Sequence, residues 1–166
     1  EVFDAFSNPV GLITKNSLIL RDIDLLSSMA RRGLVHVMIT VTTLNEELRR
    51  SMEPRTASGK KRIETIRRLS EAGIPTGVML GPVIPGLNQH EAADILKASS
   101  EAGAVAAGYT YVRLNGAVGQ IFENWIHQAF PDRAEKVLSQ IKQAHGGQLN
   151  DNEFGRRMRG AGELAE

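Results

Sequence analysis

Short apolar runs rich in β-branched residues alternate along this chain with segments whose apolar residues recur at helical spacing. The runs cover residues 10–15, 34–42, 75–80 and 104–114. They are nearly continuous, which is typical of strands buried on both faces in a parallel sheet. Because parallel neighbours are joined by helical crossovers of one hand, the alternation predicts an α/β fold.

Two architectures fit four such strand–helix units. A closed eight-stranded barrel needs about 250 residues, and this chain has 166. The prediction is therefore either an open doubly wound sheet or a partial TIM-type (β/α) barrel arc of about four parallel units. We expect residues 1–115 to form the arc, 116–147 to form helices packed on it, and 148–166 to form a polar basic tail. In both architectures, function gathers at the carboxyl ends of the strands.

Composition removes several classes of site. The chain has 20 Lys and Arg against 19 Asp and Glu, a formal net charge of +1, which argues against binding by charge alone. It has no cysteine, which excludes disulfides, thiolate nucleophiles and cysteine-ligated clusters within these residues. The four histidines lack metal-site spacing, and the common hydrolase and dinucleotide motifs are absent. No apolar stretch reaches the roughly 18 residues of a membrane span, and we expect a cytoplasmic protein.

Polar residues stand at three of the four strand ends. Lys15 ends the first strand, and Thr40 and Thr42 share one face of the second because side chains alternate. Arg113 lies near the end of the fourth. Lys15 can pair with a carboxylate or phosphate, Arg113 with a carboxylate, and the threonine hydroxyls with a ribose or carboxylate. The alternatives are a surface lysine, simple β propensity, and a salt bridge within the fold.

Two loops carry further candidates. Glu53, fixed before Pro54, can bind a ribose hydroxyl or order a neighbouring arginine. Leu80 and Pro82 flank Gly81 in a stiff loop, which indicates close backbone approach to a ligand or simply a rigid turn. Two helix starts show capping patterns. Thr43 stands three residues before Glu46, and Asn88 three before Glu91.

A basic segment spans residues 49–68 and holds eight Lys and Arg. It could bind a phosphorylated ligand or nucleic acid as a non-radical α/β module. The other interpretation is a solvated helix face, since no aromatic residues interleave with the charges to stack on bases.

An ordered set of phrases carries a resemblance to a known family. The phrases are ITKNSLILRDIDLL (13–26), VHVMITVTT (35–43), SMEPRTASGKKRIETIRRLSEAGIP (51–75), PVIPGLN (82–88), GYTYVRL (108–114) and FGRRMRG (154–160). In order and spacing the chain resembles the radical S-adenosylmethionine (radical SAM) superfamily, and within it the spore photoproduct lyase-like, DNA repair photolyase-type proteins.

The resemblance implies a partial barrel whose 4Fe-4S cluster is held by a CxxxCxxC loop after the first strand. That motif must lie upstream, because the chain has no cysteine and begins at Glu1 in mid-pattern. The strands here would be the third to sixth of the barrel. The implied chemistry is reductive cleavage of S-adenosylmethionine to a 5′-deoxyadenosyl radical that abstracts hydrogen from an unknown substrate, possibly nucleic acid. We expect the chain to be an inactive fragment of such an enzyme.

The resemblance also assigns roles by position. It implies that Lys15 lies near the methionine carboxylate and Thr40 near the ribose or carboxylate. It places Glu53 in an E-P motif, residues 80–85 beside the adenine, and Arg113 toward substrate or cofactor. Because the preceding strand is absent, it also predicts an unpaired edge at residues 10–15, through which copies of the chain could associate.

Overall fold

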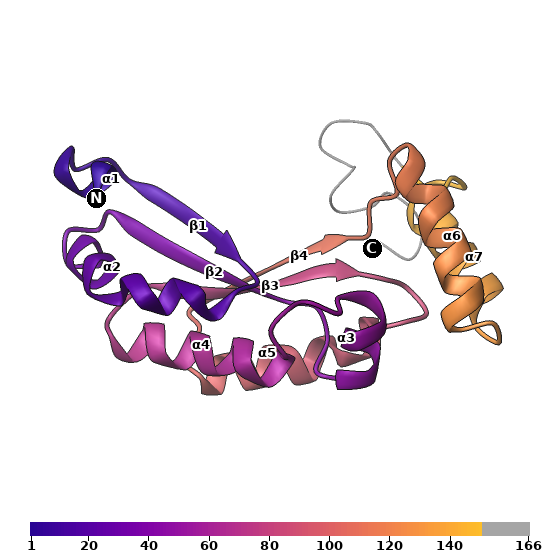
Figure 1. The fold of residues 1–166 in the computed structure, drawn as a ribbon, viewed down its shortest axis with the longest axis horizontal. Coiled ribbons are helices and arrows are strands. Elements are labelled where there is room, and N and C mark those ends of the chain that lie inside the picture. Colours follow the sequence, from indigo (N-terminus) through magenta and orange to yellow (C-terminus); the bar gives the residue numbers. More distant parts are fainter. Residues whose placement is uncertain (151–166) are drawn as a thin grey trace. The chain divides into compact units, whose positions relative to one another are not determined.

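The computed structural model describes residues 1–150 and confirms the α/β fold (Figure 1). A four-stranded sheet has the order β1 (Val10–Thr14), β2 (Val35–Val41), β3 (Thr76–Val83) and β4 (Ala106–Tyr111). The pairs β1–β2 and β2–β3 are parallel. This order and direction are consistent with a partial TIM-type arc.

Helices follow each strand. The first part of the chain holds α1 (Val2–Ala5), η1 (Ser17–Asp22), α2 (Ile23–Ala30), α3 (Glu46–Met52) and α4 (Gly59–Glu71). After β3 come η2 (Gln89–Glu91), α5 (Ala92–Glu101), α6 (Ala117–Ala129) and α7 (Ala134–Ala144). The helices α2 and α4 contact β2, and α4 contacts α5. Figure 1 shows α4 and α5 along one face of the strands.

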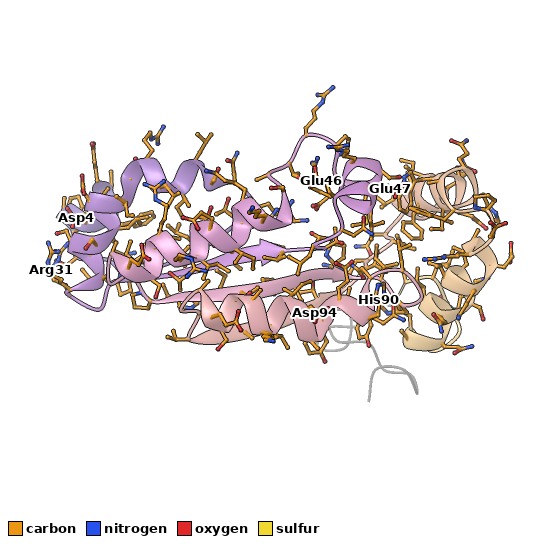
Figure 2. All side chains as sticks on the ribbon, turned by 90° about the horizontal axis from the view of Figure 1, so that it is seen from below. Asp4, Arg31, Glu46, Glu47, His90 and Asp94 are labelled. Carbon is orange, nitrogen blue, oxygen red and sulfur yellow. The ribbon has the colours of Figure 1, made fainter. Side chains whose placement is uncertain are left out.

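The described chain divides into two compact units. The first comprises residues 1–80 with 91–108, and the second comprises 81–90 with 109–150. In the first unit, Asp4 and Arg31 mark the amino ends of β1 and β2, whereas Glu46 and Glu47 on α3 lie toward their carboxyl ends (Figure 2). The unit therefore places α3 beside the ends at which the candidate site was expected.

The core of the first unit lies between the sheet and its helices. Alternate residues of β2, Val37 and Val41, are fully buried and face the same side as Ile39. Ile66 and Leu69 of α4 are also fully buried, three residues apart on one helical stripe. Because α4 contacts β2, burial of these apolar side chains stabilises the unit.

The expectation of burial on both faces is correct for β2 and wrong for β1 and β4. β1 alternates between half-buried and exposed residues, with Ile13 at 65% exposure, and β4 is largely exposed. Among the described residues, β1 pairs with β2 alone, so one of its edges is open. Association of copies through this edge stays a prediction.

Both predicted capping patterns are wrong. Asn45, not Thr43, caps α3: its side-chain oxygen accepts hydrogen bonds from Glu47 N and Leu48 N. The Thr43 hydroxyl instead donates to Glu91 Oε1 at 2.5 Å, and Glu91 Oε2 accepts from Leu44 N at 2.7 Å. The buried Glu91 carboxylate therefore takes the hydroxyl that the capping box would have used.

In the second unit, Asn88 closes its own loop rather than capping α5. Its side-chain oxygen accepts from Ile84 N at 2.7 Å, and its amide donates to Pro82 O at 3.0 Å. The α7 stripe of Val137, Leu138 and Ile141 is buried. His145 at its end is also buried, with Nε2 3.0 Å from Val112 O.

Two further expectations concern the ends of the molecule and the membrane. No helix among residues 1–150 is both long enough and apolar enough to span a bilayer. Most of the predicted basic tail, including its arginines, lies outside the described residues.

Gly77 of β3 is predicted to be the least replaceable glycine of the sheet. A Cβ there would lie 2.5 Å from Met38 Sδ and 2.8 Å from the Ala106 carbonyl oxygen. Gly77→Ala should lower the free energy of unfolding by about 1–3 kcal/mol, because the backbone of β4 must give way. Gly11→Ala in β1 is the matched control, since its Cβ meets nothing within 4 Å. Urea denaturation of the two variants checks this, and equal stabilities would contradict it.

Candidate functional site

Three side chains singled out in the sequence meet beyond the carboxyl ends of β1 and β2. The Lys15 ammonium forms an ion pair with Glu53 Oε1 and donates to Thr42 Oγ1 at 3.3 Å. The Thr42 hydroxyl in turn donates to Glu53 Oε1 at 3.2 Å. The three groups therefore form one closed hydrogen-bonded triangle.

Chain topology explains why residues so far apart in sequence meet. β1 and β2 are parallel neighbours in register, with Thr14 beside Ile39, so Lys15 and Thr42 emerge at the same edge. The short helix α3 then reverses the chain and ends at Glu53, whose N–H is bonded to Arg49 O. Pro54 follows and disfavours the helical conformation for Glu53, whose backbone leaves the helix at φ −135° and ψ 60°.

A fourth residue, Arg62 of α4, completes the cluster. Its side chain is only 2% exposed, and Nη2 donates to Glu53 Oε2 at 2.7 Å. Nη1 donates to Thr40 O at 3.0 Å and to Thr42 Oγ1 at 3.3 Å, and Nε donates to Ala57 O at 3.0 Å. The guanidinium thus links β2, the loop after α3 and α4.

Arg62 is the site residue that reasoning from the sequence missed, because it was counted among the charges of a solvated face. A signal was present. Arg62 stands four residues before Ile66 and seven before Leu69, so it falls on the inward stripe of α4. A charge on such a stripe must be paired with an acid when buried.

Arg49 fixes the loop that carries Glu53. Its guanidinium pairs with Glu46 at 2.7 and 2.9 Å, and Nη1 donates to the carbonyls of Glu53 at 3.1 Å and Thr56 at 2.8 Å. The Thr56 hydroxyl donates to the Glu53 carbonyl at 2.8 Å. The backbone around Glu53 is therefore held from several directions.

The cluster holds two cations, Lys15 and Arg62, around one carboxylate. Burial raises the pKa of the Glu53 carboxyl, hydrogen bonds from Lys15 and Arg62 lower it, and the net result is a pKa below its ordinary value. Glu53 is therefore ionised at neutral pH, and the cluster carries one excess positive charge. An ammonium has three N–H donors, and Glu53 and Thr42 accept two of those of Lys15. The Lys15 side chain is 35% exposed, so its ammonium can reach an anionic ligand.

The other candidate residues occupy different places. Thr40 is buried and joins the cluster through its backbone carbonyl. Leu80 is buried in the sheet beside Val41. Pro82 and Arg113 belong to the second unit. Their roles stay predictions.

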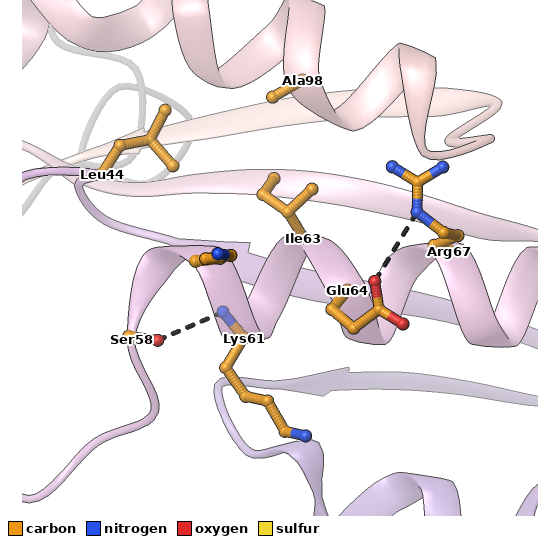
Figure 3. Close-up of a pocket in the computed structure, with 8 residues that line it drawn as sticks. Leu44, Ser58, Lys61, Ile63, Glu64, Arg67 and Ala98 are labelled. Atoms are coloured by element: carbon orange, nitrogen blue, oxygen red, sulfur yellow. Dashed lines mark hydrogen bonds and ion pairs between the residues drawn. The ribbon is translucent and has the colours of Figure 1, made fainter.

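Part of the positive charge of the basic segment is neutralised by ion pairs within the chain. Within residues 1–150, four of its eight cations are paired: Arg49 and Arg50 with Glu46, Arg62 with Glu53, and Arg67 with Glu64. An open groove of about 700 Å³ runs beside it, with Leu44, Ile63 and Ala98 among its lining residues (Figure 3). Figure 3 shows Lys61 pointing away from Ala98. The segment is thus neither a uniformly solvated face nor a continuous basic surface.

The residues do not fit an iron–sulfur cluster. The sequence has no cysteine. Residues 1–150 also contain no group of three or more His, Asp or Glu that could hold a metal ion. The cluster of Lys15, Thr42, Glu53 and Arg62 suits an anionic organic ligand instead.

Comparison with known proteins identifies a family. Residues 7–98, more than half of the chain, match the model of the Radical SAM superfamily. The chain is 27% identical to an uncharacterized protein of Methanocaldococcus jannaschii over 77% of its own length and 46% of that protein. It is 28% identical to an uncharacterized protein of Mycobacterium bovis over 77% of its own length and 38% of that protein. The chain thus spans less than half the length of these relatives.

The depressed pKa of Glu53 makes a prediction about stability. Its ion pairs stabilise the fold fully above the unfolded-state pKa, near 4.5, and that contribution is lost as pH falls through the lower folded pKa. Glu53→Gln should therefore cost about 2 kcal/mol at pH 7, and the cost should shrink below pH 4.5. Chemical denaturation at pH 7 and pH 3.5 measures this. Exposed Glu47→Gln on α3 is the control, and a cost that does not change with pH would contradict the assignment.

Proposed function

The chain belongs to the radical SAM superfamily, and we propose that it supplies part of the S-adenosylmethionine site of a radical SAM enzyme. The observation that carries this proposal is the Lys15 ammonium, held at a strand end in a cluster with one excess positive charge. Its ligand would be the carboxylate of the methionine moiety. The cofactor would be bound at the carboxyl ends of the strands, where barrels of this kind bind ligands.

The charge balance of the cluster favours a carboxylate over other groups. Arg62 is buried and its donors are used by protein acceptors, so it is not open to a ligand. Lys15 is half-buried and the more accessible of the two cations, with one donor beyond those that Glu53 and Thr42 accept among the described residues. A charge-assisted hydrogen bond from this donor to a carboxylate would make the assembly neutral.

Glu53 itself is better suited to order an arginine than to bind a ribose. Its Oε1 accepts from Lys15 and Thr42, and its Oε2 accepts from Arg62. A ribose diol would have to displace these charge-assisted bonds. Of the two roles that the sequence left open for Glu53, the geometry supports the second.

S-adenosylmethionine supplies a carbon-centred radical when it is reduced beside a 4Fe-4S cluster, and that chemistry belongs to the cofactors rather than to the protein. Because the 166 residues lack cysteine, we place the cluster ligands outside them. The part of this chain is then to bind and orient the methionine end. The isolated chain would not turn over the cofactor.

The finer assignments rest on the resemblance alone. We place the chain with the spore photoproduct lyase-like proteins on the order of its phrases, from ITKNSL at residue 13 to GYTYVRL at residue 108. Thr40 would lie near the ribose or carboxylate, Leu80 and Pro82 beside the adenine, and Arg113 toward substrate or cofactor. The substrate, whether nucleic acid or another molecule, is not defined by these residues.

Replacement of Lys15 tests the proposal. Lys15→Met should weaken binding of S-adenosylmethionine to the full-length protein about 10–100-fold, the usual value of a hydrogen bond to a charged group. The loss should be much smaller for the decarboxylated form of the cofactor, which lacks the group that Lys15 would bind. Equilibrium dialysis with both ligands measures the two losses.

Lys97→Met is the matched control, because Lys97 is an exposed lysine on α5. It should leave both affinities unchanged. Equal losses of the two ligands in Lys15→Met would show that the lysine does not bind the carboxylate, and the proposed function would lose its main support.

A further inference from the structure

The buried guanidinium of Arg62 pairs with the same carboxylate, Glu53, as the Lys15 ammonium. Arg62 is 2% exposed, although α4 around it is a helix with solvent-exposed charges. At this position an apolar side chain would continue the stripe of Ile66 and Leu69 without the cost of desolvating a charge. Stability alone therefore does not account for an arginine at this position, and its hydrogen bonds show which groups it holds.

Arg62 fixes both groups that hold Lys15. Its Nη2 binds Glu53 Oε2 at 2.7 Å, which leaves Oε1 for the ammonium. Its Nη1 donates to Thr42 Oγ1 at 3.3 Å, and the same hydroxyl accepts from Lys15 and donates to Glu53 Oε1. Bonds to Thr40 O and Ala57 O, each 3.0 Å, hold the guanidinium plane.

The same guanidinium also determines the net charge of the cluster that contains Lys15. With Arg62 in place, the carboxylate is shared between two cations and one positive charge is left over. Without Arg62, Lys15 and Glu53 would form a neutral pair. A ligand carboxylate would then have to compete with Glu53 for the ammonium and would gain no net attraction.

We propose that Arg62 is a positioning residue. It fixes the Glu53 carboxylate and the Thr42 hydroxyl, and through them it orients the Lys15 ammonium toward the carboxylate of the bound cofactor. It also leaves the cluster with the net positive charge that attracts this carboxylate. This inference rests on the proposed function, since it assumes that Lys15 binds a carboxylate. Arg62 makes no contact with the ligand in this scheme. Its effect on binding passes through Lys15.

Two substitutions separate charge from geometry. Arg62→Gln removes the charge and most of the fork of donors, whereas Arg62→Lys keeps the charge but cannot reach Glu53, Thr40 and Ala57 together. Arg68→Gln on the same helix is the matched control, because Arg68 is exposed. Each variant is made in the full-length protein. Circular dichroism and thermal unfolding establish that each is folded.

The measurement is the ratio of the dissociation constants of S-adenosylmethionine and its decarboxylated form. Arg62→Gln should weaken binding of the cofactor about tenfold and reduce the preference for the carboxylate by a similar factor. Arg62→Lys should reduce this preference about threefold, and Arg68→Gln should not change it. A purely structural role would weaken both ligands equally and leave the ratio unchanged, which would overturn the inference.

A second readout reports the geometry without ligand. The carboxyl carbon of Glu53, followed by NMR during a pH titration, should show a higher pKa in Arg62→Gln, because one of its two cations is lost. If Arg62→Gln does not fold, the ratio in Arg62→Lys decides, and an unchanged ratio rejects the inference. If Lys15→Met loses the preference for the carboxylate and both Arg62 variants keep it, this inference is rejected and the proposed function stands. Selectivity kept in Lys15→Met would reject the proposed function as well.

Discussion

The ion pair between buried Arg62 and half-buried Glu53 is the interaction on which the carboxyl-end loop of the first unit depends. It joins the buried stripe of α4 to a loop that has no regular structure of its own. Burial of a charge is costly unless its partners are complete. Here the guanidinium reaches a carboxylate, a hydroxyl and two carbonyls, so removal of any partner would leave a charge in the protein interior. Movement of the loop would break these hydrogen bonds and leave the buried guanidinium without its partners, so the loop is held in one conformation.

Order in this loop is created by polar contacts rather than by packing. The segment from Glu53 to Ser58 contributes little apolar surface, yet Arg49 and Arg62 together hold three of its carbonyl oxygens and its carboxylate. Such contacts are directional, whereas apolar burial is not. The Glu53 carboxylate, which pairs with both Lys15 and Arg62, is thereby held in a defined orientation. Two cations of the basic segment, Arg49 and Arg62, therefore hold this loop from within the fold.

Reasoning from sequence located the strands and three members of the cluster, because both follow from local pattern and topology. Lys15 and Thr42 were found at strand ends, and Glu53 from its place before a proline. Arg62 was missed because a run of charges hides the one residue that faces inward. The capping boxes failed for a related reason: Glu91, 48 residues from Thr43, competes for the same hydroxyl. A short sequence pattern does not predict a hydrogen-bond partner that is distant in sequence and is brought near only by the tertiary fold.

The contacts of Glu91 tie the turn after β2 to the start of α5. Its carboxylate binds the amides of Leu44 and Asn45, and residues 44 and 45 would otherwise form an ordinary surface connection. Hydrogen exchange at these two amides then requires the start of α5 to separate from the turn. An exposed turn should accordingly exchange on the slow timescale of the sheet, and any opening at this edge of the strands would be a cooperative event shared by two segments nearly fifty residues apart.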